Sequence, residues 1–160
     1  MIESTGATVE KIGTNGFKAI SSANMHGITV DADEIPDLVP IMAVLLTFCK
    51  GESRIVNAGR LRIKESDRLA AICSELKALG ADITEGEDFL IINGTQVLDG
   101  NTVSSHNDHR SAMAAAIAAC RCEGEVIIDG AQKSVKKSYP NFFEDYNKLG
   151  GKAHVLQFRK

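Results

Sequence analysis

Two long apolar segments, each followed by a short run of β-forming residues, organise the chain. The first segment, residues 35–50, has Pro36 near its start, and the second, SAMAAAIAAC at residues 111–120, has the same apolar character. An early proline and apolar residues on nearly every face predict buried helices. A glycine follows each segment, and then comes SRIV at residues 53–56 or EVIID at residues 125–129. The pattern predicts a helix followed by a strand in both places.

A second, amphipathic helix is predicted after each strand and the basic connector that follows it. The apolar positions that mark its face are Leu69, Ile72, Leu76 and Leu79 in the first copy, and Phe142 or Phe143, Tyr146 and Leu149 in the second. These positions recur at the spacing of one helix face. Each helix is expected to end in a left-handed cap, at Gly80 and at Gly150.

A β-hairpin is predicted to close each repeat. Residues 81–84 and 89–92 flank a polar turn, and AHVLQF at residues 153–158 begins the same element after the second amphipathic helix. Residues 7–12 and 17–20 also fit this pattern, because they surround the turn sequence Thr-Asn-Gly. Alternating apolar residues around such turns are typical of hairpins.

Together these elements predict an α/β fold made of repeated βαβαββ units. The expected division is the tail of one unit at residues 1–20, a second unit at residues 21–94 and a third at residues 95–160. The chain therefore begins inside a unit, and we expect it to be only part of a domain.

The two copies keep a common spacing in sequence. The pairs that lie 73 residues apart are Gly51 and Gly124, Asp37 and Arg110, and Lys64 and Lys137. In α/β units the connections that leave one end of the strands build the ligand crevice. We therefore expect Asp37, Lys64, Arg110 and Lys137 to lie on one rim.

Composition narrows the possible classes of protein. The chain has 160 residues, is 44% hydrophobic and carries a formal net charge of −3, which is ordinary for a globular domain. The longest uncharged run, residues 38–49, is too short to span a bilayer. The acidic balance and the low aromatic content argue against a nucleic-acid groove. Cys49, Cys73, Cys120 and Cys122 match no usual zinc spacing, so we expect buried thiols in a reducing compartment.

Basic residues gather at the starts of the two amphipathic helices. The cationic set consists of Arg62, Lys64, Arg68, Arg110, Lys133, Lys136 and Lys137. Helix starts and guanidinium groups attract phosphate and carboxylate, so an anionic ligand is expected. Asp37, Glu65 and His109 are the acid or base candidates, although each could instead serve a helix start or an ion pair. Residue types alone indicate an anion-binding α/β repeat domain, without a metal-ligand or glycine-rich phosphate motif.

Four longer motifs in the chain resemble those of a known protein family. The segments DADEIPDLVP (31–40), RLRIKESDRL (60–69), HNDHRSAMA (106–114) and KKSYPNFFED (136–145) resemble, in order and spacing, the C-terminal part of the EPSP synthase family. The resemblance implies the enolpyruvyl transferase fold, an inside-out α/β barrel with βαβαββ units around a pseudo-threefold axis. It also implies transfer of the enolpyruvyl group from phosphoenolpyruvate to the 5-hydroxyl of shikimate 3-phosphate, a step towards chorismate and the aromatic amino acids.

The resemblance also implies roles for individual residues. Asp37 corresponds to the base at the 5-hydroxyl, and Lys64 corresponds to a residue that contacts the shikimate ligand. Glu65 resembles the family's proton-transfer group at the enolpyruvyl carbon, and His109 occupies a family site position. No metal ion and no organic cofactor is expected.

An anion clamp is the other part of the implied site. Arg68, Arg110 and Lys137 resemble the family's phosphoenolpyruvate-binding cations, and glyphosate would contact the same three side chains. Asp67 is expected to serve the helix start, whereas Arg60 and Arg62 stay unassigned. The family's N-terminal site residues have no counterpart in this chain. We therefore expect half a site, inactive alone, whose partners are the two small-molecule substrates and the missing N-terminal part of the enzyme.

Three alternatives remain open at the level of the sequence. The related enolpyruvyl transferase acting on UDP-N-acetylglucosamine shares the fold, and the RNA 3′-phosphate cyclases share the βαβαββ unit. A non-catalytic anion-binding module is the third. We expect a bacterial cytoplasmic location and leave a plastid location open.

Overall fold

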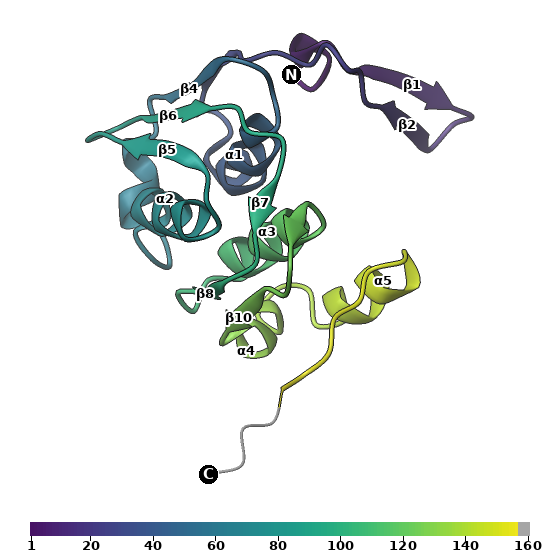
Figure 1. The fold of residues 1–160 in the computed structure, drawn as a ribbon, viewed down its shortest axis with the longest axis vertical. Helices are drawn as coiled ribbons and strands as arrows, with labels where there is room; N and C mark the ends of the chain where they lie inside the picture. Colours follow the sequence, from purple (N-terminus) through teal and green to yellow (C-terminus); the bar gives the residue numbers. More distant parts are fainter. Residues whose placement is uncertain (157–160) are drawn as a thin grey trace.

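A four-stranded sheet covered on one face by two helices forms the larger part of the fold. The computed structural model describes residues 1–156, and Figure 1 shows their arrangement. In chain order the elements of this part are β3 (Thr29–Asp31), α1 (Val39–Thr47), β4 (Glu52–Val56), α2 (Arg68–Ala78), β5 (Asp82–Glu85) and β6 (Leu90–Asn93). The strand order is β3-β4-β6-β5, with β3 parallel to β4 and the other pairs antiparallel. The element order is therefore βαβαββ, as the sequence pattern predicts.

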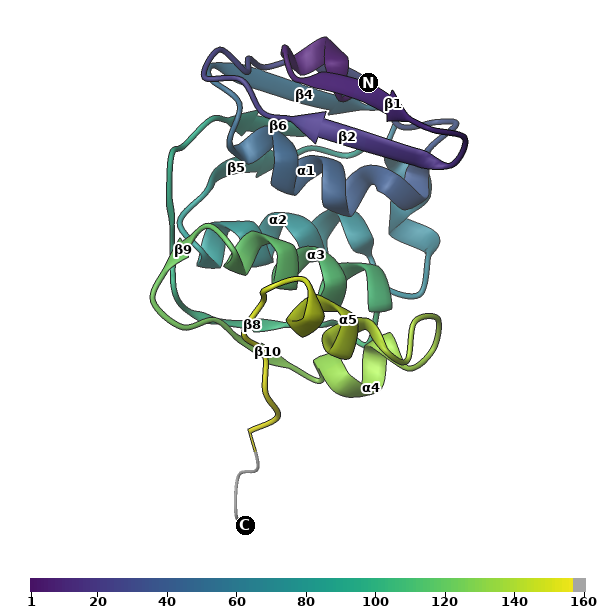
Figure 2. The same cartoon turned by 90° about the vertical axis from the view of Figure 1, so that its right-hand side faces the viewer.

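The following part of the chain repeats the parallel strand pair and the first helix. Its elements are β7 (Leu98–Asp99), β8 (Thr102–Ser104), α3 (His109–Ala119), β9 (Cys122–Glu123), β10 (Ile127–Asp129), α4 (Ala131–Val135) and α5 (Phe142–Lys148). β8 pairs with β10 and β7 pairs with β9, both in parallel. Helix α3 packs against α1 and α2, so three helices form the layer below the sheet in Figure 2.

The 73-residue repeat is present in the strand registers. Thr29 lies opposite Arg54 in the β3–β4 pair, and Thr102 lies opposite Ile127 at the same positions of the β8–β10 pair. The residue after each second strand takes a left-handed conformation, with φ of 56° at Asn57 and 70° at Gly130. Matching registers and matching turns show that the two stretches share one local fold.

The buried core lies between the sheet and the helix layer. It contains the predicted apolar face of α2, with Leu69, Ile72, Leu76 and Leu79 all at 2% exposure or less. A 3-10 turn, η2 (Pro36–Leu38), precedes α1 and divides the predicted helix over residues 35–50. Another 3-10 turn, η3 (Gly59–Ile63), precedes α2.

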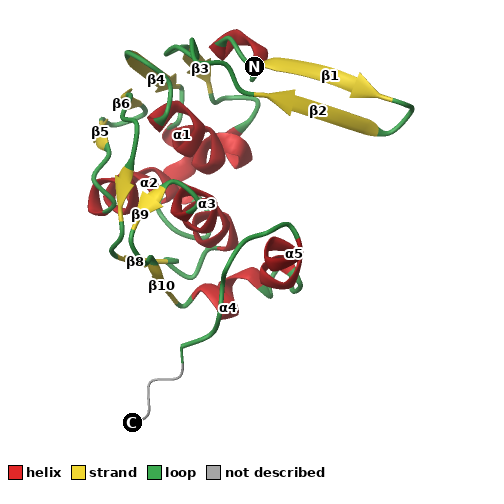
Figure 3. Ribbon diagram, turned by 45° about the vertical axis from the view of Figure 1, so that its right-hand side comes forward, coloured by secondary structure: helices red, strands yellow, loops and turns green. Residues whose placement is uncertain are grey.

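The N-terminal elements lie at one side of this body. A short turn, η1 (Glu3–Thr5), leads into the hairpin of β1 (Thr8–Ile12) and β2 (Gly16–Ile20). Figures 1 and 3 show the hairpin projecting away from the sheet. Most of its side chains are exposed, so the predicted hairpin forms without an apolar cover from the described residues.

The second copy departs from the sequence prediction after β10. Helix α5 forms, but its predicted apolar face is only half-buried at Phe142, Phe143 and Tyr146, and Leu149 is 89% exposed. In the first copy α2 packs against β5, whereas no corresponding hairpin covers α5 among residues 1–156. The strand predicted at residues 153–158 is absent from residues 153–156, and the rest of it lies outside the described residues.

The cysteines also divide between two environments. Cys49 and Cys73 are buried, as predicted, and burial raises the pKa of both thiols. The prediction is wrong for Cys120, which is exposed at the end of α3, and Cys122 is half-buried. Within the described part of the chain, every helix is too short or too polar to cross a membrane.

Candidate functional site

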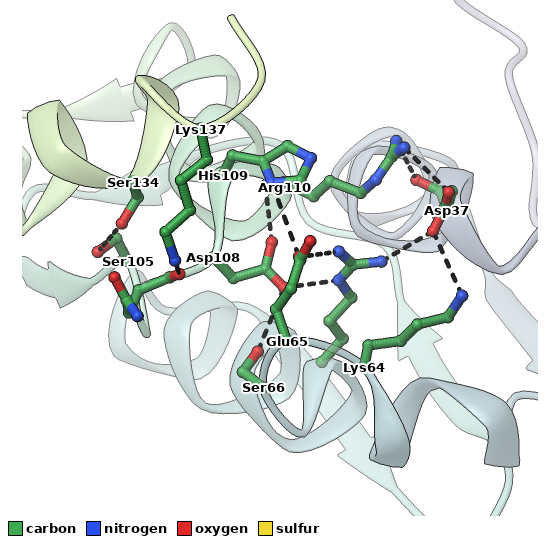
Figure 4. A network of polar contacts seen from close by, with 12 residues as sticks. Asp37, Lys64, Glu65, Ser66, Ser105, Asp108, His109, Arg110, Ser134 and Lys137 are labelled. Carbon is green, nitrogen blue, oxygen red and sulfur yellow. Dashed lines mark hydrogen bonds and ion pairs between the residues drawn. The ribbon is translucent and has the colours of Figure 1, made fainter.

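Three chain segments far apart in sequence meet at the starts of helices α2 and α3. Asp67 caps α2 by accepting a hydrogen bond from the backbone N–H of Ala70, and Asp108 caps α3 by accepting one from Arg110. The η2 turn brings Asp37 to the same place, as Figure 4 shows. Because acidic residues are favoured at helix starts, this local geometry follows from the sequence of each segment.

Asp37 lies at the centre of the cations that the sequence predicts. Its Oδ1 accepts a hydrogen bond from Nη1 of Arg68 at 2.8 Å, and its Oδ2 accepts one from Nη2 of Arg110 at 3.0 Å. Lys64 Nζ is 3.8 Å from the same carboxylate. Partial burial alone would raise the pKa of Asp37, but Arg110, Arg68 and Lys64 together hold this pKa below its usual value. Asp37 is therefore a carboxylate at neutral pH.

Arg68 is held by three carboxylates at once. Besides Asp37, its Nε donates to Oδ2 of Asp108 at 2.6 Å, and its Nη2 donates to Glu65. Only 3% of the Arg68 side chain is exposed. A buried guanidinium requires compensating charge, which these contacts supply.

Glu65 and His109 are neighbours in the site. His109 Nδ1 lies 3.6 Å from Oε2 of Glu65, and this nitrogen is buried with no hydrogen-bond partner among the described residues. Glu65, Asp108 and His109 offer potential metal-ligating atoms within 4.8 Å of one another. Arg68 already contacts both carboxylates of this cluster, so the position of a cation is taken by a side chain.

Lys137 lies apart from the other predicted residues. It follows α4, and its Nζ donates to the backbone carbonyl of Asn107. Figure 4 shows it on the far side of Asp108 from Asp37. Lys64 and Arg110 each contact Asp37, in keeping with their expected place on one rim, whereas no hydrogen bond or ion pair within residues 1–156 joins Lys137 to these three residues.

The structure also assigns the remaining charged residues of the connector before α2. Arg62 pairs with Asp67 at 2.8 Å and with Glu85 at 3.1 Å, so it joins the connector to the β5–β6 hairpin. Arg60 is exposed and lies 3.9 Å from Asp33. The expectation that Asp67 serves the helix start is confirmed.

Two residues that hold the site together in the structure were not among the site residues predicted from the sequence. Asp108 is fully buried and joins Arg68 to the start of α3. Glu75 accepts hydrogen bonds from the backbone N–H of Ser104 and from His106, and so holds the loop that leads to Asp108. The Asn-Asp-His-Arg motif contained the N-cap signal of Asp108, but its contact with Arg68 spans 40 residues and has no local signature.

Taken together, three cations and three carboxylates share this site. Each of Lys64, Arg68 and Arg110 contacts at least one acidic side chain. Such an arrangement can bind an anion by exchanging a carboxylate for it, and its acids can move protons to and from a bound molecule.

Comparisons with known proteins identify the family to which the chain is similar. The family model described as EPSP synthase (3-phosphoshikimate 1-carboxyvinyltransferase) matches residues 1–146. A 3-phosphoshikimate 1-carboxyvinyltransferase of Clostridium perfringens is 53% identical over 133 residues, which cover 83% of this chain and 31% of the relative. The chain thus spans about a third of the length of the curated relatives that it matches.

Solved structures support the fold as well. EPSP synthase of Acinetobacter baumannii superposes with a TM-score of 0.85 at 30% identity, covering 98% of this chain and 39% of that one. The enolpyruvyl transferase NikO of Streptomyces tendae gives a TM-score of 0.78 at 21% identity, over 94% of this chain and 34% of that one, which supports the fold alone. The open α/β arrangement is therefore a partial enolpyruvyl transferase domain, and the chain belongs to the EPSP synthase family.

Proposed function

We propose that this chain is part of an enzyme that transfers the enolpyruvyl group of phosphoenolpyruvate to the 5-hydroxyl of shikimate 3-phosphate. The observation that carries the proposal is the meeting of one carboxylate, Asp37, with Lys64, Arg68 and Arg110. The matched relatives are named for this reaction. The partners proposed are the two small-molecule substrates and the rest of the same enzyme, in a bacterial cytoplasm.

The chemistry requires two proton-transfer groups and an anion clamp. The hydroxyl oxygen gives up its proton to a base and bonds to the central carbon of phosphoenolpyruvate, while the methylene carbon gains a proton from an acid and becomes a methyl group. In the second step that methyl group loses a proton, the carbon–oxygen bond to phosphate breaks, and inorganic phosphate leaves. Acid and base groups must therefore lie on both sides of the reacting carbons.

The residues of the site supply these groups. We assign Asp37 to the hydroxyl proton and Glu65 to the proton on the methylene carbon, with Lys64 beside the shikimate ligand. We also assign His109 to proton transfer, because its Nδ1 lies 3.6 Å from Oε2 of Glu65. Arg68, Arg110 and Lys137 are assigned to phosphoenolpyruvate, since guanidinium and ammonium groups match its carboxylate and phosphate.

Anion binding and base activation are coupled in this arrangement. The Nη groups of Arg68 and Arg110 that we assign to phosphoenolpyruvate donate to Asp37. The anion therefore competes with Asp37 for the same donors. Once the anion occupies these donors, the cations that lower the Asp37 pKa are partly neutralised, and its carboxylate becomes a better proton acceptor.

Removing the Asp37 charge should therefore tighten anion binding. We expect Asp37→Asn in the 160-residue chain to raise the affinity for inorganic phosphate and for phosphoenolpyruvate by roughly tenfold, because a competing carboxylate is lost. Chemical-shift titration of the arginine side chains measures this. Asp33→Asn is the matched control, since Asp33 carries the same charge near Arg60 but contacts none of the three cations. Equal affinities in the two variants would contradict the competition.

The reaction itself is tested with a chimera. The 160-residue chain alone is expected to show no measurable turnover, because it spans about a third of its relatives. We expect activity when the chain replaces the matching segment of the Clostridium perfringens relative, with a rate within about tenfold of that enzyme. Product formation from phosphoenolpyruvate and shikimate 3-phosphate is measured. A folded chimera without this activity, or one that uses UDP-N-acetylglucosamine instead, would overturn the proposed reaction.

A further inference from the structure

Asp108 contacts Arg68 on the edge of the guanidinium that is turned away from the reacting groups. Its Oδ2 accepts from Nε of Arg68 at 2.6 Å, whereas the two Nη groups of Arg68 donate to Asp37 and Glu65. Ser66 Oγ donates to the same Oδ2 at 3.3 Å. The Nε of Arg68 is thus held by Asp108, which Figure 4 labels, while its two Nη groups face Asp37 and Glu65.

Burial separates Asp108 from the residues that can touch a ligand. Asp108 has no exposed surface, whereas the side chains of Asp37 and Glu65 are 48% and 45% exposed. Burial alone would raise the pKa of Asp108, but hydrogen bonds from Arg68 and from the backbone of Arg110 hold this pKa below its usual value. Asp108 therefore stays charged and can act on a ligand only through other residues.

Arg110 depends on Asp108 as well. The second oxygen of Asp108, Oδ1, accepts from the backbone N–H of Arg110 at 2.8 Å and so fixes the first turn of α3. His106 and Asn107 just before it have φ of 49° and 55°, a left-handed conformation that non-glycine residues rarely adopt. Such a backbone persists only where surrounding contacts hold it, which the Glu75 contacts to Ser104 and His106 do.

We infer that Asp108 is a positioning residue, which sets the orientation of Arg68 through Nε and the backbone position of Arg110 through the α3 cap. This inference rests on the proposed function, because it assigns both arginines to phosphoenolpyruvate. One buried carboxylate thereby joins two helix starts and two of the clamp cations. Arranging donors before the ligand arrives lowers the cost of binding it.

Asparagine at this position separates orientation from helix capping. In Asp108→Asn the amide oxygen can still cap α3, but the charged acceptor for Arg68 Nε is lost. In the chimera we expect the KM for phosphoenolpyruvate to rise about 10- to 100-fold, the loss of one charge-assisted hydrogen bond, with a much smaller change in kcat. Asp67→Asn is the matched control, because Asp67 caps α2 with the same side chain and does not contact Arg68.

A spectroscopic measurement on the 160-residue chain tests the contact without turnover. The Nε–H proton of Arg68 should exchange slowly with water in the wild type and in Asp67→Asn, and rapidly in Asp108→Asn, with the signal assigned from its loss in Arg68→Lys. Slow exchange in Asp108→Asn, or a KM equal to that of Asp67→Asn, would overturn the positioning role. An inactive wild-type chimera would instead contradict the proposed reaction and leave the exchange result to decide the role of Asp108.

Discussion

Replacement of Asp37 by alanine is expected to lower the turnover of the chimera about 100- to 10,000-fold, the usual contribution of a general base. Asp37 is the one acidic side chain within the described residues that contacts Lys64, Arg68 and Arg110 together. Its loss removes the proton acceptor but leaves the cations. We therefore expect the loss in kcat, with the KM for phosphoenolpyruvate unchanged or lower, in steady-state assays with both substrates varied.

Asp33→Ala provides the control for this result. Asp33 lies in the same connection between β3 and α1, and it forms an ion pair with Arg60 at 3.9 Å. Turnover should stay within about threefold of the wild-type chimera, as for surface changes away from a site. A similarly small loss in Asp37→Ala would favour the anion-binding module over the enzyme.

Substitution of Gly27 by alanine is expected to destabilise the chain by about 3 kcal/mol or more. A Cβ atom at this position would lie 2.0 Å from the backbone carbonyl oxygen of Glu52. Gly27 also donates a backbone hydrogen bond to Lys50 at 2.8 Å, so the two segments cannot separate without breaking it. Urea unfolding of the 160-residue chain, followed by far-ultraviolet circular dichroism, measures the change in the free energy of unfolding.

Two further glycines provide a second variant and a control for this prediction. Gly100, 73 residues later, would place its Cβ 2.5 Å from the carbonyl oxygen of Glu125, so Gly100→Ala should also be destabilising. Gly59 is the control, because its Cβ would meet only Asp88 Cβ at an ordinary 3.5 Å. A Gly27→Ala variant as stable as Gly59→Ala would show that the fold does not need the close approach of Gly27 to the backbone at the start of β4.

Much of the fold could be predicted because the signals are local. Apolar spacing located α1, α2 and α3 and the strands β4, β5 and β6 to within a few residues. The 73-residue spacing of Gly51 and Gly124 also reappears in three dimensions, where both take positive φ. Periodicity and glycine positions describe the conformation of neighbouring residues, so they could be interpreted without knowledge of the packing.

Other features depended on neighbours that a local pattern does not reveal. The spacing of Phe142, Tyr146 and Leu149 predicted an apolar helix face, but burial needs an opposing surface, and no hairpin among residues 1–156 covers α5 as β5 covers α2. Cys120 resembled a core thiol in an apolar run and proved to be exposed at a helix end. The sequence shows that these residues are apolar, but it does not show whether another part of the chain packs against them.

The sequence by itself determined the repeat, the helices whose starts carry the charges, and most of the charged residues of the candidate site. The tertiary structure decided which acidic side chain pairs with which basic one. Arg68 reaches Asp37 across 31 residues and Asp108 across 40, and Arg110 reaches Asp37 across 73. These contacts exist because α1, α2 and α3 pack around one core, and the spacing of Asp37 and Arg110 indicated a shared rim without indicating which side chains would pair.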